Sequence, residues 1–75
     1  MNNERRKRIA SALEKLEEAK NELEQIAEEE REAYENMPES IQDSERGCAM
    51  EEAADNLDSS ANSIEEAIDY LNEIQ

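Results

Sequence analysis

The side chains of this chain that could do chemistry are a run of four bases, one cysteine, two tyrosines and many carboxylates. The bases are consecutive: Arg5, Arg6, Lys7 and Arg8. The chain contains no histidine, so Cys48 has no imidazole that would activate it as a nucleophile. A single glycine excludes a glycine-rich phosphate-binding loop. We therefore expect a protein that is not an enzyme and that uses no cofactor or metal.

The basic cluster at residues 5–8 is the sharpest polar feature of the sequence. Arginine side chains bind phosphorylated ligands in a bidentate manner, and a tyrosine ring can stack on such a ligand. This predicts a site for a small anionic, nucleotide-like ligand, formed by Arg5, Arg6, Lys7, Arg8 and Tyr70. The alternative is charge compensation, in which the bases only offset Asp69, Glu73 and the negative end of a second helix.

The overall charge is strongly acidic, with 22 Asp and Glu against 8 Lys and Arg and a net charge of −14. Such a chain is not expected to bind nucleic acid directly, because attraction to phosphates needs the opposite sign. Regularly spaced carboxylates can instead imitate a phosphate backbone and occupy a basic groove. The candidate acidic face for binding a basic protein consists of Glu51, Glu52, Asp55, Asp58, Glu65 and Glu66. The alternative for this face is solubility alone.

Two stretches of apolar residues, spaced by threes and fours, must position these groups. That spacing is typical of helices with one apolar seam, and it predicts helices at about 3–35 and 44–74. We expect the Asn3 side chain to cap the first helix and Asn36 to end it in a left-handed conformation. Pro38 prevents continuation of the helix, so residues 36–43 form the turn, with a short helical segment at 39–42. The whole of 1–75 is expected to be a single domain.

Folding the chain about residue 40 pairs the two seams as an antiparallel hairpin. The expected layers are Ile9/Leu71, Leu13/Ile68, Leu16/Ile64, Lys20/Ala61, Leu23/Leu57, Ala27/Ala54 and Glu30/Met50. Large residues face small ones in several layers, as good packing requires. At the turn we expect Tyr34 to pack over Gly47, with Arg31 and Arg46 beside the ring.

A second apolar stripe widens each helix face beyond what one hairpin can cover. Its members are Ala12, Ala19, Ile26 and Ala33 on the first helix and Ala53, Ala67 and Ile74 on the second. A two-helix hairpin with an alanine-rich seam buries little apolar surface, so self-association is the expected route to stability. The sequence predicts an all-α antiparallel hairpin that assembles into a homo-oligomeric helical bundle. The predicted oligomer interface contains Ile26, Ala33, Ala67 and Ile74.

The compartment is expected to be a reducing cytoplasm. The lone Cys48 cannot form an internal disulfide, which suits a reducing environment. No apolar run approaches the roughly 18 residues of a membrane span, so no contact with a membrane is expected. The basic start lacks the apolar stretch of a secretory signal.

The turn sequence Asn-Met-Pro-Glu-Ser-Ile-Gln-Asp-Ser-Glu-Arg-Gly, from Asn36 to Gly47, carries a family resemblance. With its flanking Glu/Ala/Leu helices it resembles small uncharacterised two-helix proteins encoded by phages and mobile elements of Gram-positive gut bacteria. The resemblance implies an accessory protein that counters host defence. Our interpretation is a sponge that sequesters a small anionic, nucleotide-like signal. An acidic inhibitor that mimics nucleic acid, and a purely structural coiled-coil protein, remain the alternatives.

Overall fold

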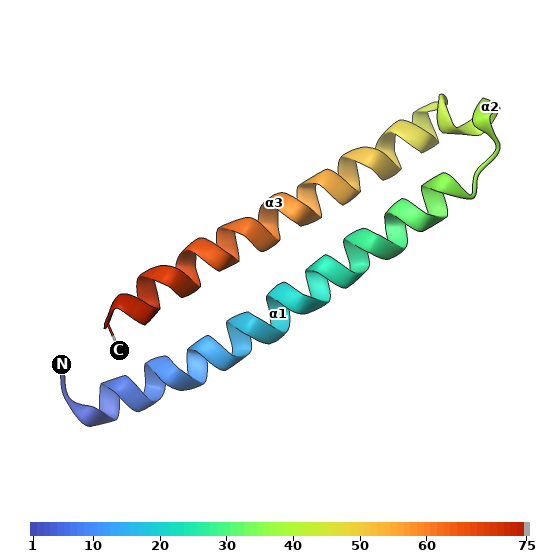
Figure 1. The fold of residues 1–75 in the computed structure, drawn as a ribbon. Coiled ribbons are helices and arrows are strands. Elements are labelled where there is room, and N and C mark those ends of the chain that lie inside the picture. The colour runs from blue at the N-terminus through green and yellow to red at the C-terminus, as the bar shows by residue number, and fades with distance from the viewer. Residues whose placement is uncertain (75) are drawn as a thin grey trace.

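The protein is all-helical and folds as an elongated hairpin of two long helices. The computed structural model describes residues 1–74. Helix α1 spans Asn3–Glu35, the short α2 spans Glu39–Gln42, and α3 spans Glu45–Ile74. Figure 1 shows α1 and α3 running antiparallel, with α2 at the closed end and both termini at the open end. The all-α architecture expected from the sequence is confirmed; the structure holds a single chain, so assembly stays a prediction.

Helix α1 begins with a side-chain cap and ends without a left-handed residue. The Asn2 side-chain oxygen accepts a hydrogen bond from the backbone N–H of Arg5 at 2.8 Å. The cap is therefore Asn2 and not Asn3, because Asn3 already belongs to the helix. Asn36 keeps a right-handed conformation, with φ −84° and ψ −3°. The expected left-handed stop was wrong, because no residue in 1–74 has a positive φ. Helix α1 ends at Glu35, and Pro38, two residues after Asn36, prevents the helix from continuing.

The turn is compact because α2 packs directly against the start of α3. The side-chain amide of Gln42 donates to the carbonyl of Tyr34 at 3.0 Å, which ties α2 back to the end of α1. The Ser44 hydroxyl accepts from the backbone N–H of Gly47 at 3.4 Å and so caps α3. A Cβ at Gly47 would overlap the carbonyl of Gln42. The glycine thus accommodates the backbone of α2, and the expected packing of Tyr34 over it stays a prediction.

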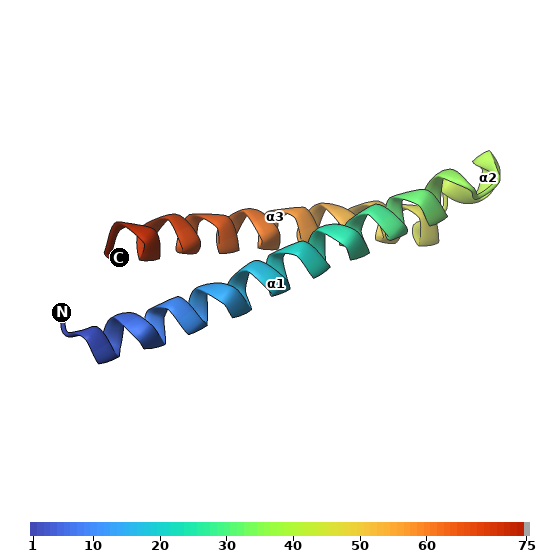
Figure 2. The same cartoon turned by 60° about the horizontal axis from the view of Figure 1, so that its bottom comes forward.

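The core is a narrow seam between α1 and α3. Its buried apolar residues are small apart from one isoleucine: Ala27, Ala54, Ala61 and Ile68 are 1–4% exposed. Both members of the expected Ala27/Ala54 layer are among them, while the seam leucines are half-buried. The molecule is correspondingly thin, with principal extents of 58 × 14 × 12 Å. Figure 2 shows the two long helices crossing at a shallow angle, with no third layer over either of them.

Candidate functional site

The two flanks of the seam carry different kinds of side chain: one is charged and the other is apolar. Successive helix residues are rotated by about 100°, so the residue before a seam position and the residue after one lie on opposite flanks. On one flank lies the charged edge: Glu17, Lys20, Glu24 and Arg31 of α1 with Glu51, Asp55, Asp58 and Glu65 of α3. On the other lies the apolar edge: Ala12, Ala19, Ile26 and Ala33 of α1 with Ala53, Ala67 and Ile74 of α3.

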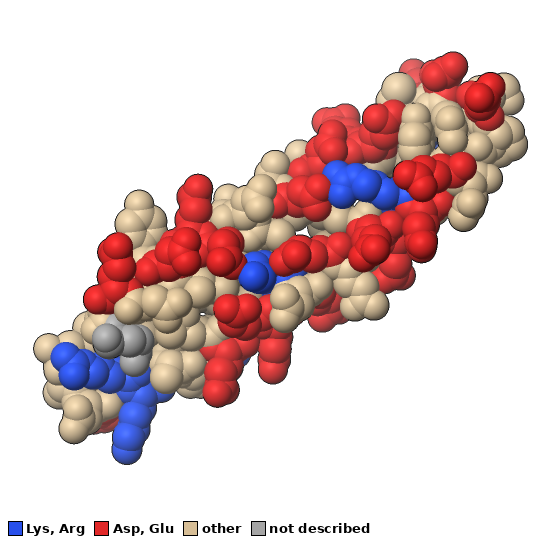
Figure 3. Space-filling view, in the orientation of Figure 1, with Lys and Arg blue, Asp and Glu red and all other residues tan. Residues whose placement is uncertain are grey.

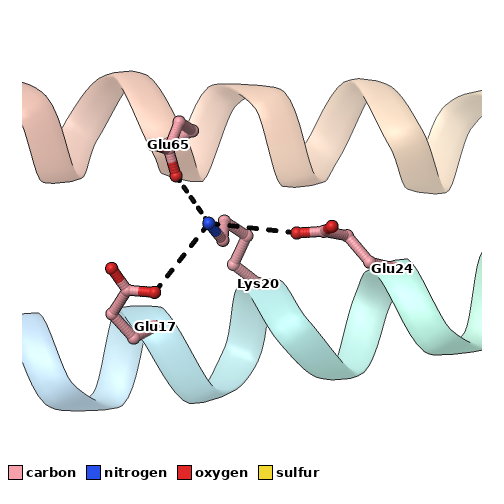
Figure 4. A network of polar contacts seen from close by, with 4 residues as sticks. All are labelled: Glu17, Lys20, Glu24 and Glu65. Atoms are coloured by element: carbon pink, nitrogen blue, oxygen red, sulfur yellow. Dashed lines mark hydrogen bonds and ion pairs between the residues drawn. The ribbon is translucent and has the colours of Figure 1, made fainter.

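Lys20 is the centre of the first ionic cluster on the charged edge. Its Nζ donates to Glu65 Oε2 across the seam at 2.7 Å and lies 3.8 Å from Glu17 and 4.0 Å from Glu24 on its own helix (Figure 4). The Lys20 side chain is only 20% exposed and shares a surface hollow with Ala61. The hydrogen bond to Glu65 raises the pKa of Lys20, and the charges of all three carboxylates act in the same direction. The ammonium group is therefore held charged between three acids.

Arg31 is the centre of the second ionic cluster, which lies about three helical turns nearer than Lys20 to the closed end of the hairpin. Its Nη2 lies 2.6 Å from Asp58 Oδ2 and 3.1 Å from Asp55 Oδ1, so one guanidinium nitrogen joins two carboxylates of α3. These hydrogen bonds raise the pKa of Arg31 further above its ordinary value. In the face seen in Figure 3, the bases in the middle of the rod are enclosed by acidic side chains.

Tyr34 extends the same edge to the turn. Its hydroxyl donates a hydrogen bond to Glu51, which raises the pKa of Tyr34 to about 12, with burial of the ring adding to the effect. The residue lines a hollow of roughly 200 Å³ with Arg31, Met50 and Asp55. Tyr34 thus shares this hollow with Arg31, while its hydroxyl reaches a carboxylate of α3 that the sequence did not single out; the expected position of Arg46 beside the ring stays a prediction.

The acidic face predicted on α3 is consequently divided into two groups. Glu51, Asp55, Asp58 and Glu65 are engaged with residues of α1. Glu52 and Glu66 are exposed and form no ion pair with any residue of the described chain. Only the second group presents carboxylates that are free for another molecule. The sequence did not distinguish the two groups, because it identifies acidic positions and not the cation that each one reaches.

The basic cluster lies at the open end of the hairpin, on the first turns of α1. All four side chains, at residues 5–8, are exposed. Four consecutive residues point in four directions around a helix, so one copy cannot aim all of them at a single small ligand. Tyr70 is 70% exposed and lines a hollow with Glu66, Asp69 and Glu73, all from α3. The structure surrounds this tyrosine with carboxylates, and the basic residues do not contribute to that hollow.

The apolar edge carries exposed hydrophobic side chains along its length. Ile26 is 42% exposed and Ile74 is 41% exposed, while Ala33 is exposed and Ala67 is half-buried. Near the middle of α1, Ala19, Glu22, Leu23 and Ile26 line a shallow hollow of about 290 Å³. The predicted interface residues therefore remain available for a partner.

The remaining reactive groups offer little chemistry. Cys48 is exposed with a free thiol. Within residues 1–74, no three acidic, cysteine or histidine side chains are grouped so that they could hold a metal ion. In the same range, none of the helices has both the length and the apolar character needed to cross a membrane. Comparison with protein-family models, with curated proteins and with solved structures found no match for this chain.

Proposed function

We propose that this chain is a non-enzymatic, self-associating protein that acts by stoichiometric binding of a basic partner to its acidic rod. One observation carries the proposal: two of the four bases of residues 9–75 are already held in ion pairs within the hairpin. Lys20 and Arg31 are each held by carboxylates of α3 at 2.6–3.1 Å. These two charges are therefore neutralised within the hairpin, which leaves Lys15 and Arg46 as the remaining bases of residues 9–75 against its other carboxylates.

The size of the charge imbalance supports an ionic partner. Residues 9–75 carry 21 acidic and four basic side chains, a formal net charge of −17. This charge is distributed along a rod 58 Å long. A long surface of one sign attracts a partner of the opposite sign and accelerates their association. Mutual repulsion among the carboxylates would also be relieved when such a partner binds.

The partner class that fits best is a protein with a groove for nucleic acid. Such a groove is long and basic, because it neutralises a phosphate backbone. Glu52 and Glu66 on α3, with Asp69 and Glu73 further along, are the exposed acids that we assign to this contact. Because the turn resembles that of phage-encoded proteins, we propose by analogy that the target is one of the host's defence proteins.

A competition pull-down tests the proposal. Tagged protein is incubated with bacterial lysate, with and without added double-stranded DNA, and the retained proteins are identified by mass spectrometry. We expect nucleic-acid-binding proteins that are released by the DNA. The triple change Glu52→Gln, Glu66→Gln and Asp69→Asn should weaken capture at least tenfold. The control variant removes the same number of charges from α1 and should keep its capture; it combines Glu14→Gln, Glu18→Gln and Glu28→Gln. Capture that survives both competitor and triple change would contradict the proposal.

A second candidate is binding of a small anion at the basic cluster. It is favoured by the position of four exposed bases on adjacent residues in a chain of net charge −14. Thermal-shift measurements with a panel of nucleotides test it. If the cluster binds a nucleotide, Arg5→Gln with Arg8→Gln should abolish the shift while helicity is kept, and Arg→Lys should impair it because bidentate contacts are lost. Tyr70→Ala should weaken it as well. Absence of any nucleotide-dependent shift would leave charge compensation as the role of the cluster.

A further inference from the structure

The exposed side of α1 carries an apolar column and a charged column next to each other. Residues seven apart lie on the same side of a helix in a helical bundle. The apolar column is Ala12, Ala19, Ile26 and Ala33, all exposed. The charged column is Arg8, Lys15, Glu22 and Glu29, also exposed. The hollow lined by Ala19, Glu22, Leu23 and Ile26 lies where the two columns meet, at the middle of the helix.

The charged column is divided by sign. Its two bases occupy the first half of α1 and its two acids the second half. None of the four forms an ion pair with another residue in 1–74, in contrast to Lys20 and Arg31 on the opposite edge. When two such columns run antiparallel, the bases of one copy lie opposite the acids of the other.

We infer that a second copy of this chain packs along α1 in antiparallel orientation, about a two-fold axis at Ala19. In a two-fold interface each contact occurs twice with the roles exchanged. Arg8 then faces Glu29 of the second copy, and Lys15 faces Glu22. Ala12 faces Ile26 of the second copy, so that a small residue meets a large one. Ala19, at the centre, is also the midpoint of the helix Asn3–Glu35.

The same charges argue against the two other ways of packing this face. A parallel arrangement of the two α1 helices would place Arg8 against Arg8 and Glu29 against Glu29. An arrangement of α1 against α3 of the second copy would oppose the charged column with an uncharged one, Ala49, Asn56, Ser63 and Tyr70. Only the antiparallel α1 pair gives every member of the charged column an opposite charge.

The inference has a consequence for the basic cluster. Antiparallel α1 helices centred on Ala19 place the two copies of residues 5–8 at opposite ends, roughly 40 Å apart at 1.5 Å per residue. The two clusters then cannot share one small anion. The inference rests on the self-association in the proposed function, and it adds the face and the direction of pairing.

Cysteine cross-linking distinguishes the three arrangements. In a Cys48→Ala background, Ala19→Cys should give nearly complete disulfide-linked dimer under mild oxidation, because the two residues meet at the axis. The matched control Ala33→Cys should give almost none, since its two copies lie roughly 40 Å apart. Cross-linking of both variants would indicate a parallel pair, and cross-linking of neither would indicate packing of α1 on α3; either result overturns the inference.

Charge reversal tests the same pairing without cysteines. Arg8→Glu with Lys15→Glu makes the charged column wholly acidic and should weaken self-association on the order of tenfold at low salt. Adding Glu22→Lys and Glu29→Lys to that variant reverses the column completely and should restore wild-type association. Failure to restore it would contradict antiparallel pairing. Sedimentation of the wild-type chain separates the two levels: a monomer at all concentrations refutes self-association itself, while an oligomer without the Ala19→Cys cross-link refutes only the direction.

Discussion

The charged edge and the apolar edge of this hairpin flank the same seam, but only the charged edge carries side chains with ion-pair partners on the other helix. On the charged edge, Lys20 and Arg31 reach across to α3 and join the two helices through ion pairs. On the apolar edge, Ile26 and Ile74 remain about two-fifths exposed. The charged edge thus finds its ion-pair partners within a single copy, whereas the apolar edge keeps hydrophobic side chains exposed to solvent. The comparison indicates that the charged edge joins the two helices of one copy, whereas the apolar edge is the surface on which we propose that a second copy packs.

The largest effect is expected from placing a charge on the apolar edge. Ile26→Glu puts a carboxylate where we propose that a second copy packs, so it should dissociate the oligomer. Helicity should fall at the same time, because helices in such a thin hairpin depend on packing. Light scattering and circular dichroism at one protein concentration measure both effects. The control Gln25→Glu adds the same charge at the neighbouring exposed position; if the two variants behave alike, the apolar edge is not an interface.

A smaller effect should separate seam packing from ionic contact. Leu23→Ala removes a half-buried seam residue and should lower the free energy of unfolding by about 2–4 kcal/mol. Lys20 lies in the preceding seam layer, and Lys20→Ala removes ion pairs that lie at the surface. This change should therefore lower the free energy of unfolding by less than Leu23→Ala does. Urea denaturation at low and high salt measures both variants. If Lys20→Ala proves as damaging as Leu23→Ala, the charged edge contributes as much stability as the seam packing.

The smallest effect concerns Tyr34 at high pH. The hydrogen bond to Glu51 raises the pKa of Tyr34 to about 12 in the folded protein, against 10.0 for an unperturbed tyrosine. The folded state therefore holds this proton more tightly, so the stabilisation is complete below pH 10 and is lost as the pH rises toward 12. Absorbance titration of a Tyr70→Phe variant reports Tyr34 alone, with helicity followed in parallel. A midpoint near 10 while the helices are intact would show that the hydrogen bond is absent.

The fold followed from the sequence because helical periodicity is a strong and repeated signal. Both members of the Ala27/Ala54 layer were expected to face each other, and both are almost fully buried. Details that depend on one side chain were not predictable in the same way. Asn2 and Asn3 are equally good caps by type, and the structure uses Asn2. At Asn36 a right-handed residue sufficed, since Pro38 already prevents the helix from continuing.

The candidate site was less predictable than the fold, for a physical reason. Composition reveals how many acids a face carries, but their availability depends on which cation each one meets across the seam. Lys20 was expected to face Ala61, and the sequence did not show that its ammonium group also forms ion pairs with three carboxylates. A lone lysine at a seam position facing an alanine is the signal that identifies such a centre. Tyr70 was assigned to the basic cluster, whereas the hollow it lines is acidic.

The central claim is that the apolar edge is completed by a second copy of the chain. Sedimentation equilibrium of the wild-type protein at micromolar concentration tests it most directly. We expect a mass at least twice that of the 8.6 kDa chain, with helicity that falls together with the mass on dilution. A well-folded monomer of 8.6 kDa over the same range would contradict the account, because the hairpin would then be stable with its apolar edge uncovered.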